Sequence, residues 1–231
     1  MTSLLGQSFK RAALGAAFFV SWLAVTALPV RADTALDQSL IASAERGDGA
    51  AIQRLLKQGA SIAARDGRGR TALLAATHGN HVEVARLLIA AGADVNAKDA
   101  IEDSPFLYAG AEGRNEILSM TLAAGADLKS TNRYGGTALI PAAHHGHVET
   151  VKILLVTSID KDHVNRLGWT ALLEAVILGD GGPAHTEIVR LLVAAGANVA
   201  IADRDGITPL AHSRRRGYAG IARILEGAGA K

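Results

Sequence analysis

Residues 71–76 read Thr71-Ala-Leu-Leu-Ala-Ala, and similar stretches recur along the chain at a fixed interval. Three further copies each start 33 residues after the one before: Ser104-Pro-Phe-Leu-Tyr-Ala, Thr137-Ala-Leu-Ile-Pro-Ala and Thr170-Ala-Leu-Leu-Glu-Ala. A fifth copy opens at Thr208, 38 residues after Thr170, so five residues are inserted before it. A period of this length indicates a repeat protein, in which each copy is one small structural unit.

Each copy has the same order of apolar and turn-forming residues. A short apolar segment ends near a glycine, and a second one with helical spacing, such as Val84 to Ile89, closes at another glycine, such as Gly92. A polar and β-branched run with the composition of a loop follows. We therefore predict an all-α chain of helix, tight turn, helix and extended loop. The repeats are placed at about 38–70, 71–103, 104–136, 137–169, 170–207 and 208–231, where the first copy is degenerate.

These stretches resemble the ankyrin-repeat family. Its Thr-Pro-Leu-His opening is matched by Thr71-Ala-Leu-Leu, its Gly-His-x-Glu turn by Gly146-His147-Val148-Glu149, and its Gly-Ala-Asp-Val-Asn closing appears unchanged at Gly92 to Asn96. The resemblance covers about residues 36–230 and implies an ankyrin-repeat solenoid of about six units, with polar capping repeats at both ends. One departure is systematic, because the opening His is replaced by Leu74, Leu107, Ile140, Leu173 and Ala211. This replacement predicts more apolar packing between repeats.

Residues 1–32 differ from the rest of the chain. Lys10 and Arg11 precede an uncharged apolar stretch from Ala12 to Pro29, and Val30-Arg31-Ala32 follows. This order predicts a secretory signal peptide cut after Ala32 and a periplasmic or secreted repeat domain of residues 33–231. The alternative is a retained membrane anchor, although the apolar stretch is somewhat short for one. Signal and repeat together resemble bacterial periplasmic ankyrin proteins, so we expect the periplasm.

Charge and composition exclude several functions. Without residues 1–32 the net charge falls from +2 to −1, which argues against nucleic acid as a partner. The chain has no cysteine, so it has no thiolate metal site and no cysteine nucleophile. Neither a phosphate-binding glycine loop nor a Gly-x-Ser-x-Gly elbow is present. We predict that the protein is no enzyme and takes no cofactor.

The cluster His144-His145-Gly146-His147 is the one pattern typical of metal binding. Adjacent residues of a short helix point in different directions, so we interpret these histidines as structural or surface residues and predict no metal site. A metal-handling exported protein is kept as an alternative function.

In ankyrin-like stacks the loop tips and the exposed side of the first helix line a concave surface. Of the five aromatic residues after position 32, Tyr108, Tyr134 and Trp169 fall on this surface in consecutive repeats. Large aromatic side chains are common anchors of protein interfaces. The predicted partner-binding residues are Arg68, Arg70, Ile101, Asp103, Tyr108, Tyr134, His144, His145, Trp169 and Glu174.

The surface predicts a non-catalytic scaffold that binds a protein partner. We expect it to be a monomer and to serve outside the cytoplasm as an adaptor, accessory or inhibitor of that partner. We expect no contact with a membrane once the signal is removed. A host-directed secreted effector is the other alternative, and it differs only in its destination.

Two irregularities lie near this surface. Ser158 stands where the other repeats have a glycine that ends the helix, which we expect to cost of order 1 kcal/mol. The five inserted residues lie within Asp180–His185, and we expect them to lengthen the turn between the two helices of that repeat.

Overall fold

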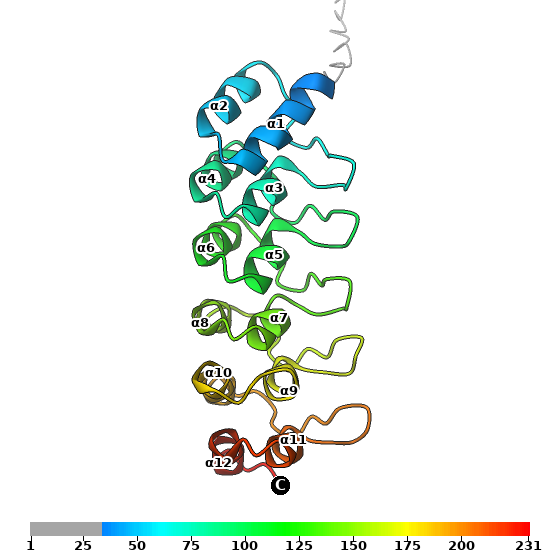
Figure 1. Ribbon diagram of the computed structural model, residues 1–231, viewed down its shortest axis with the longest axis vertical. Helices are drawn as coiled ribbons and strands as arrows, with labels where there is room; N and C mark the ends of the chain where they lie inside the picture. Colours follow the sequence, from blue (N-terminus) through cyan, green and yellow to red (C-terminus); the bar gives the residue numbers. More distant parts are fainter. Residues whose placement is uncertain (1–33) are drawn as a thin grey trace, which may run out of the picture. The chain divides into compact units, whose positions relative to one another are not determined.

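The computed structural model describes residues 34–231, and within them the chain forms twelve α-helices and no strands. The helices form six pairs that stack in chain order, and the loops between pairs project together on one side (Figure 1). The pairs are α1 (Thr34–Arg46) with α2 (Gly49–Lys57), α3 (Ala72–His78) with α4 (Val82–Ala90), α5 (Pro105–Ala111) with α6 (Asn115–Ala123), α7 (Leu139–His144) with α8 (Val148–Leu155), α9 (Ala171–Ile177) with α10 (Pro183–Ala194), and α11 (Pro209–Arg215) with α12 (Ala219–Gly227). The predicted signal peptide lies outside the described residues.

The opening Thr or Ser of a repeat starts the first helix of its pair. The Thr71 hydroxyl accepts a hydrogen bond from the Leu74 amide, and the residues at the same position of the third, fifth and sixth repeats cap their helices in the same way. Such caps satisfy one of the free amides at a helix start. Thr137 is the exception, since its buried hydroxyl has no hydrogen-bond partner and α7 begins only at Leu139.

The core is one continuous layer that runs through all six pairs. The second helix of each pair contributes a buried stripe at helical spacing, such as Val84 and Leu88 in α4. No pair can bury this stripe alone, so each depends on its neighbours, as in other stacked-repeat proteins. The residues that replace the family's opening His are at most 3% exposed in repeats two to five, which confirms the predicted apolar packing: Leu74, Leu107, Ile140 and Leu173.

The close contact between α5 and the residue before α7 requires glycine. A Cβ atom built on Gly110, in α5, would lie 2.8 Å from the Cβ atom of Ala138, next to α7. Since real Cβ atoms do not approach this closely, a larger residue at position 110 would push these two helices apart.

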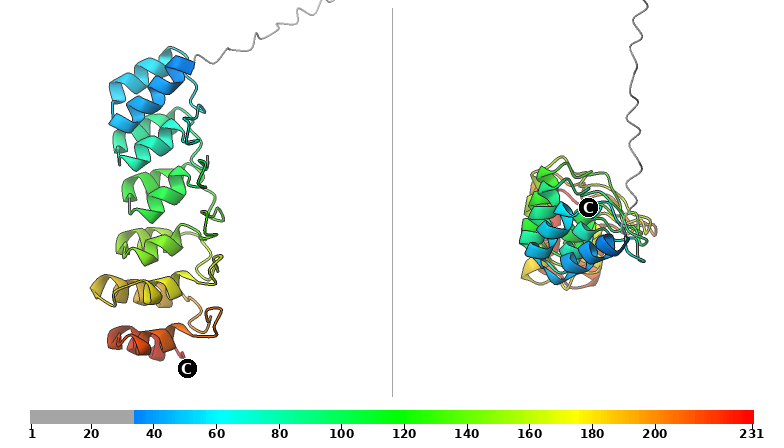
Figure 2. Two further views of the ribbon diagram at one scale, coloured as in Figure 1. Left: turned by 45° about the vertical axis from the view of Figure 1, so that its right-hand side comes forward. Right: turned by 90° about the horizontal axis from the view of Figure 1, so that it is seen from above.

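Successive loops are joined by cationic side chains that donate to the main chain of a neighbouring loop, the next one for Arg65 and Lys98 and the preceding one for Arg166 and Arg204. Arg65 Nη1 lies 2.5 Å from the carbonyl oxygen of Lys98, and Lys98 Nζ lies 2.6 Å from that of Thr131. Arg166 Nη1 lies 2.7 Å from the carbonyl oxygen of Arg133, and Arg204 bonds to that of Arg166. We call these four contacts the loop ties. They join the five loops that Figure 2 shows in a row along one side of the stack.

The fourth repeat ends its second helix without glycine. The Thr157 hydroxyl donates to the carbonyl oxygen of Leu154 at 2.6 Å and accepts from the amide of Ile159 at 3.2 Å. In the second repeat the corresponding main-chain groups bond directly, from Ala93 to Leu88. The threonine hydroxyl therefore offsets part of the cost expected at Ser158.

The insertion in the fifth repeat is divided between turn and helix. The turn between α9 and α10 spans five residues, where the turn between α3 and α4 spans three. Helix α10 has twelve residues, where α4 has nine. The predicted lengthening of the turn is confirmed, and the helix is longer as well, because Pro183 starts it early by occupying its first position.

Both ends of the described stack carry polar side chains, as predicted for capping repeats. The exposed charged residues include Glu45, Arg46, Arg54 and Lys57 in the first pair and Arg214, Arg215, Arg216 and Arg223 in the last. Among residues 34–231, no helix is long and apolar enough to cross a membrane.

Candidate functional site

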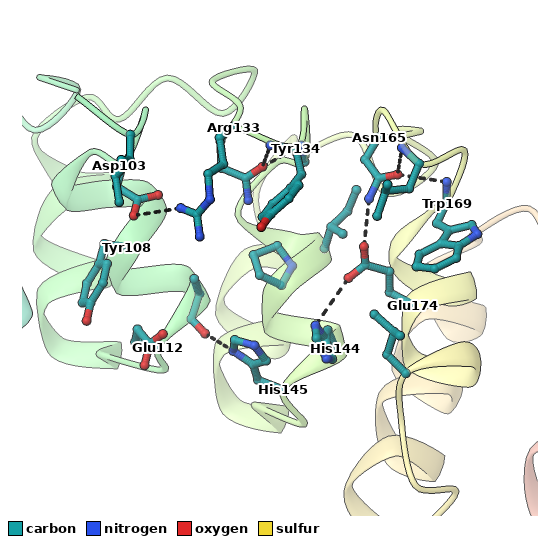
Figure 3. A pocket seen from close by; sticks show the side chains of 18 of the residues that line it. Asp103, Tyr108, Glu112, Arg133, Tyr134, His144, His145, Asn165, Trp169 and Glu174 are labelled. Atoms are coloured by element: carbon teal, nitrogen blue, oxygen red, sulfur yellow. Dashed lines mark hydrogen bonds and ion pairs between the residues drawn. The ribbon is translucent and has the colours of Figure 1, made fainter. Parts of the chain in front are cut away.

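A groove of about 670 Å³ lies between the loops and the first helices of repeats two to five. Figure 3 shows side chains of its lining, which comes mainly from α5, α7 and α9 and the loops before them, with His78 added from the end of α3. Eight of the ten predicted partner-binding residues line it: Ile101, Asp103, Tyr108, Tyr134, His144, His145, Trp169 and Glu174. We call this surface the central groove.

The two predicted arginines of the first loop lie outside the central groove. Arg70 is buried, and its guanidinium bonds to Asp66 at 2.8 Å and to Glu45 at 3.2 Å. These contacts give Arg70 a place in the fold rather than on a binding surface. Arg68 is exposed at the tip of the same loop, where its carbonyl oxygen accepts from the amide of Ala100.

The half of the groove nearer the N-terminus is built on stacked rings. The rings of His78 and Tyr108 are parallel within 26° and their centroids lie 4.0 Å apart. Burial lowers the pKa of His78 and raises that of Tyr108. The contact between the two rings holds both side chains in the wall of the groove.

One ion pair crosses this half of the groove. Arg133 Nη1 lies 3.6 Å from Asp103 Oδ2, and the same guanidinium sits over the ring of Tyr134, 4.9 Å from its centroid. Burial raises the pKa of Asp103 although Arg133 opposes the change. Arg133 thus links a wall carboxylate to the exposed face of an aromatic residue.

The other half is organised around Asn165 and Glu174. Asn165 Oδ1 accepts the amides of Leu167 and Trp169, at 2.9 and 3.0 Å, and so fixes the loop that presents both side chains. Asn165 Nδ2 donates to Glu174 Oε1 at 2.8 Å. Glu174 Oε2 faces His144 Nδ1 at 3.8 Å, beyond hydrogen-bond distance. Burial raises the pKa of Glu174, although the bond from Asn165 lowers it.

Exposed apolar side chains concentrate on this surface. Six large hydrophobic residues are exposed among residues 34–231, and four of them line the central groove: Ile101, Tyr134, Leu167 and Leu178. Ile101 and Tyr134 are 51% and 52% exposed. A gathered patch of this kind marks a site of interaction.

The register of the loops also places Leu167 on this surface, although it was left out of the predicted partner-binding residues. Leu167 lies 33 residues after Tyr134, which itself lies 33 after Ile101, so all three occupy the same place in successive loops. Arg133 and Asn165 were also missed. Asn165 occupies the turn position held elsewhere by Asp66, Asp99, Asn132 and Asp203, whose Oδ1 atoms accept the amides two and four residues later.

The histidines of the fourth repeat contact one another and the main chain. The rings of His144 and His145 lie 4.6 Å apart, but His145 Nδ1 is already bonded to the carbonyl oxygen of Ala111 at 2.8 Å. His147 meets His145 edge-on, with the ring centroids 5.7 Å apart. Across residues 34–231, no three His, Asp or Glu side chains come together as metal ligands. The metal-handling alternative therefore has no support from the geometry.

Comparison with known proteins gives a consistent result. A family model described as ankyrin repeats (3 copies) matches residues 15–99 and 106–203. The putative ankyrin repeat protein YahD of Escherichia coli (strain K12) is 46% identical over 57 residues, which cover 25% of this chain and 28% of YahD. The matched part is thus little more than a quarter of that relative.

Solved structures match over most of the chain. An ankyrin repeat domain from Acinetobacter baumannii AYE is 59% identical, with a TM-score of 0.81, over 83% of this chain and 98% of that domain. The ankyrin repeat domain of Bcl-3, described as a unique member of the IkappaB protein family, is 28% identical, with a TM-score of 0.75, over 84% of this chain and 86% of that one.

Proposed function

The chain belongs to the ankyrin-repeat family, whose repeats generally mediate contacts between proteins, and from this premise we propose that it is a non-catalytic scaffold that holds a protein partner in the central groove. The observation that carries the proposal is the gathering of exposed apolar side chains in one groove that crosses four repeats. Burying them against a partner would provide the main favourable term of association.

The centre of the groove has the residues that usually dominate binding energy. Tyr134 and Trp169 come from neighbouring loops, and both present large rings to the groove (Figure 3). Aromatic anchors with fixed positions lose little side-chain entropy when they bind. Asn165 fixes the Trp169 loop by accepting its amide, so this anchor is held in place before a partner arrives.

The chemistry of the groove supports binding rather than catalysis. Ankyrin repeat domains are typically interaction modules without enzyme activity, and the residues that line the groove include no serine, threonine, cysteine or lysine. The usual side chains for covalent acyl transfer are therefore absent from its lining.

We place this function outside the cytoplasm, with the periplasm as the expected compartment and the monomer as the binding unit. The basic start, apolar middle and small-residue end of residues 1–32 support export. The role there would be that of an adaptor, accessory or inhibitor. Fractionation of cells and medium tests the location: protein in the cytoplasm would contradict it, whereas protein bound to the membrane with residues 1–32 attached would show that the signal is kept as an anchor.

The experiment that tests the groove is cross-linked capture from the exported fraction with residues 33–231. Three forms are compared: the unaltered sequence, Tyr134→Ala/Trp169→Ala, and Val156→Ala. Val156 is 87% exposed and lies outside the groove, so its variant controls for loss of an exposed apolar side chain. We expect capture of one protein by the first and third forms and its loss from the second, with circular dichroism equal in all three. Equal capture by all three would refute the groove as the binding site.

A further inference from the structure

Glu174 is a buried carboxylate with an acceptor left free. Its side chain is 8% exposed and lies in the groove wall, in the first helix of the fifth repeat. Asn165 fills one lone pair of Oε1, while Oε2 has only His144 near it, at 3.8 Å. Figure 3 shows this carboxylate between the ring of His144 and the loop that carries Trp169. Oε2 is not one of the fully buried atoms that lack a partner, so it stays open to the groove, where a donor from a bound partner can reach it.

The charges around the groove point to the missing donor. Its lining holds three acidic residues, Asp103, Glu112 and Glu174, and one arginine, Arg133. Arg133 pairs with Asp103. Within the described part of the chain, no other lysine or arginine forms an ion pair with Glu112 or Glu174. With neutral histidines the lining therefore carries a net charge of about −2, and a segment that fits must bring positive charge.

The side chains beside Glu174 favour a guanidinium over other cations. Trp169 and His144 both line the groove with Glu174 (Figure 3). Asn165 bonds to the Glu174 carboxylate and to the amide of Trp169, and His144 Nδ1 lies 3.8 Å from Glu174 Oε2. A guanidinium is flat, stacks on aromatic faces and donates several hydrogen bonds in one plane, whereas an ammonium is a compact and strongly hydrated charge. Leu178 borders the same space and would contact the apolar stem of an arginine side chain.

We propose that Glu174 is the recognition subsite for an arginine side chain in an extended segment of the protein partner, whose neighbouring apolar side chain rests on Tyr134 and Leu167. The inference rests on the proposed function, since it names what the central groove selects. Loops of successive repeats lie about 10 Å apart, so the distance from Ile101 to Leu167 is about 20 Å. A strand of about six residues spans it.

The test is selection from a displayed library of random 12-residue peptides on residues 33–231. The match to the solved Acinetobacter ankyrin repeat domain covers 98% of that domain, which crystallised as a domain of this kind. The same library is selected on Glu174→Gln, on Tyr134→Ala/Trp169→Ala, and on Glu149→Gln. The glutamine introduced by Glu174→Gln can still accept from Asn165, so the loop is kept while the charge is removed. Glu149 is an exposed acid outside the groove and controls for the loss of one negative charge.

We expect the unaltered protein and Glu149→Gln to enrich peptides with arginine close to an apolar residue. Glu174→Gln should enrich the apolar residue without the arginine. Enrichment of apolar peptides with no arginine preference, or the same arginine preference in Glu174→Gln, would overturn the subsite and leave the groove standing. No enrichment above the Tyr134→Ala/Trp169→Ala form would overturn both the subsite and the proposed function.

An affinity measurement on one selected peptide makes the test quantitative. Trp169 is the sole tryptophan of residues 33–231, so its fluorescence reports binding beside Glu174. Replacing the peptide's arginine by neutral, nearly isosteric citrulline should weaken binding to the unaltered protein about 30-fold, as loss of one partner of a buried charge pair does. With Glu174→Gln the two peptides should bind within about twofold of each other. An equal loss in both proteins would place the arginine elsewhere.

Discussion

Arg70 and Arg68 lie two residues apart in one loop, and both are candidates for partner binding on sequence alone, yet the structure gives them different tasks. Replacing each by methionine keeps a long apolar stem and removes the guanidinium. Arg70→Met should destabilise the stack, and Arg68→Met should not, because only Arg70 is buried and bonded to carboxylates of the protein.

The magnitude follows from the two bonds that Arg70 loses. The bond to Asp66, at 2.8 Å and largely buried, is charge-assisted and contributes about 1.5–3 kcal/mol. The pair with Glu45, whose side chain is 54% exposed, adds about 0–1 kcal/mol. The two contributions together span about 1.5–4 kcal/mol, so the free energy of unfolding should fall by about 2–3 kcal/mol, near the middle of that range, in Arg70→Met. Exposed Arg68 should change it by less than about 0.5 kcal/mol.

The pH dependence gives the same experiment a second readout. Burial raises the pKa of Asp66, but the hydrogen bonds from Arg70 and Arg68 outweigh it, so this carboxyl has a pKa below its usual range. A depressed carboxyl pKa contributes stability above the unfolded value, about 4, which is lost as the pH falls through the folded value. The difference between Arg70→Met and the unaltered protein should be full at pH 7 and shrink below about pH 4.

Thermal melts of residues 33–231 measure the effect. For a domain of this size we expect the midpoint of Arg70→Met to fall by about 5–10 °C and that of Arg68→Met to stay within about 2 °C. Because each repeat depends on its neighbours, hydrogen exchange should show the loss first in α1 and α2. An Arg70→Met protein that melts like the unaltered one but no longer binds the partner would refute the structural role of Arg70.

Three further changes test other parts of the structure. Gly110→Ala should cost about 1–3 kcal/mol by forcing α5 from its neighbour, while Gly67→Ala, which meets open space, should change the melt little; equal melts would show that the stack absorbs the extra atom. Thr157→Val removes the hydroxyl that bonds to Leu154 and Ile159 at the end of α8, and it should lower the free energy of unfolding in chemical denaturation by about 1 kcal/mol. An unchanged denaturation midpoint would contradict a stabilising role for these two hydrogen bonds. Burial, His145 and His185 lower the pKa of His144, so its protonation sets in only below the ordinary pKa of histidine, where it should place a cation beside Glu174 and weaken binding of the arginine peptide. His144→Asn should abolish this pH dependence, and its persistence would assign it to another group.

The fold could be predicted because one register governs every repeat. Once Thr71 is aligned with Thr137 and Thr170, the buried face of each first helix follows from its neighbours, and the structure buries Leu74 and Leu173 as expected. The ends of individual helices escaped this argument. Helix α10 has three residues more than α4, because Pro183 occupies its first position. The glycines before Pro183 indicated a longer turn and gave no sign of the longer helix.

The sequence predicted which residues lie on the candidate site, but not which of them bond to one another. Sequence register places Tyr134 and Trp169 on one surface. The bond from Asn165 to Glu174, nine residues on, has a counterpart only in the sixth repeat, where His212 donates to Asp203 with donor and acceptor exchanged. The role of Arg70 was equally hidden, because one of its partners lies 25 residues earlier in the chain.

The loop ties also affect how this surface can evolve. Each tie ends on a main-chain carbonyl oxygen, which every amino acid has, so it imposes no requirement on the side chain at the neighbouring tip. The tip residues that face the groove, such as Ile101, Tyr134 and Leu167, can therefore be exchanged one at a time while the loops keep their mutual spacing. The scaffold separates the residues that set its geometry from those that set its specificity, and new specificities become accessible by single substitutions.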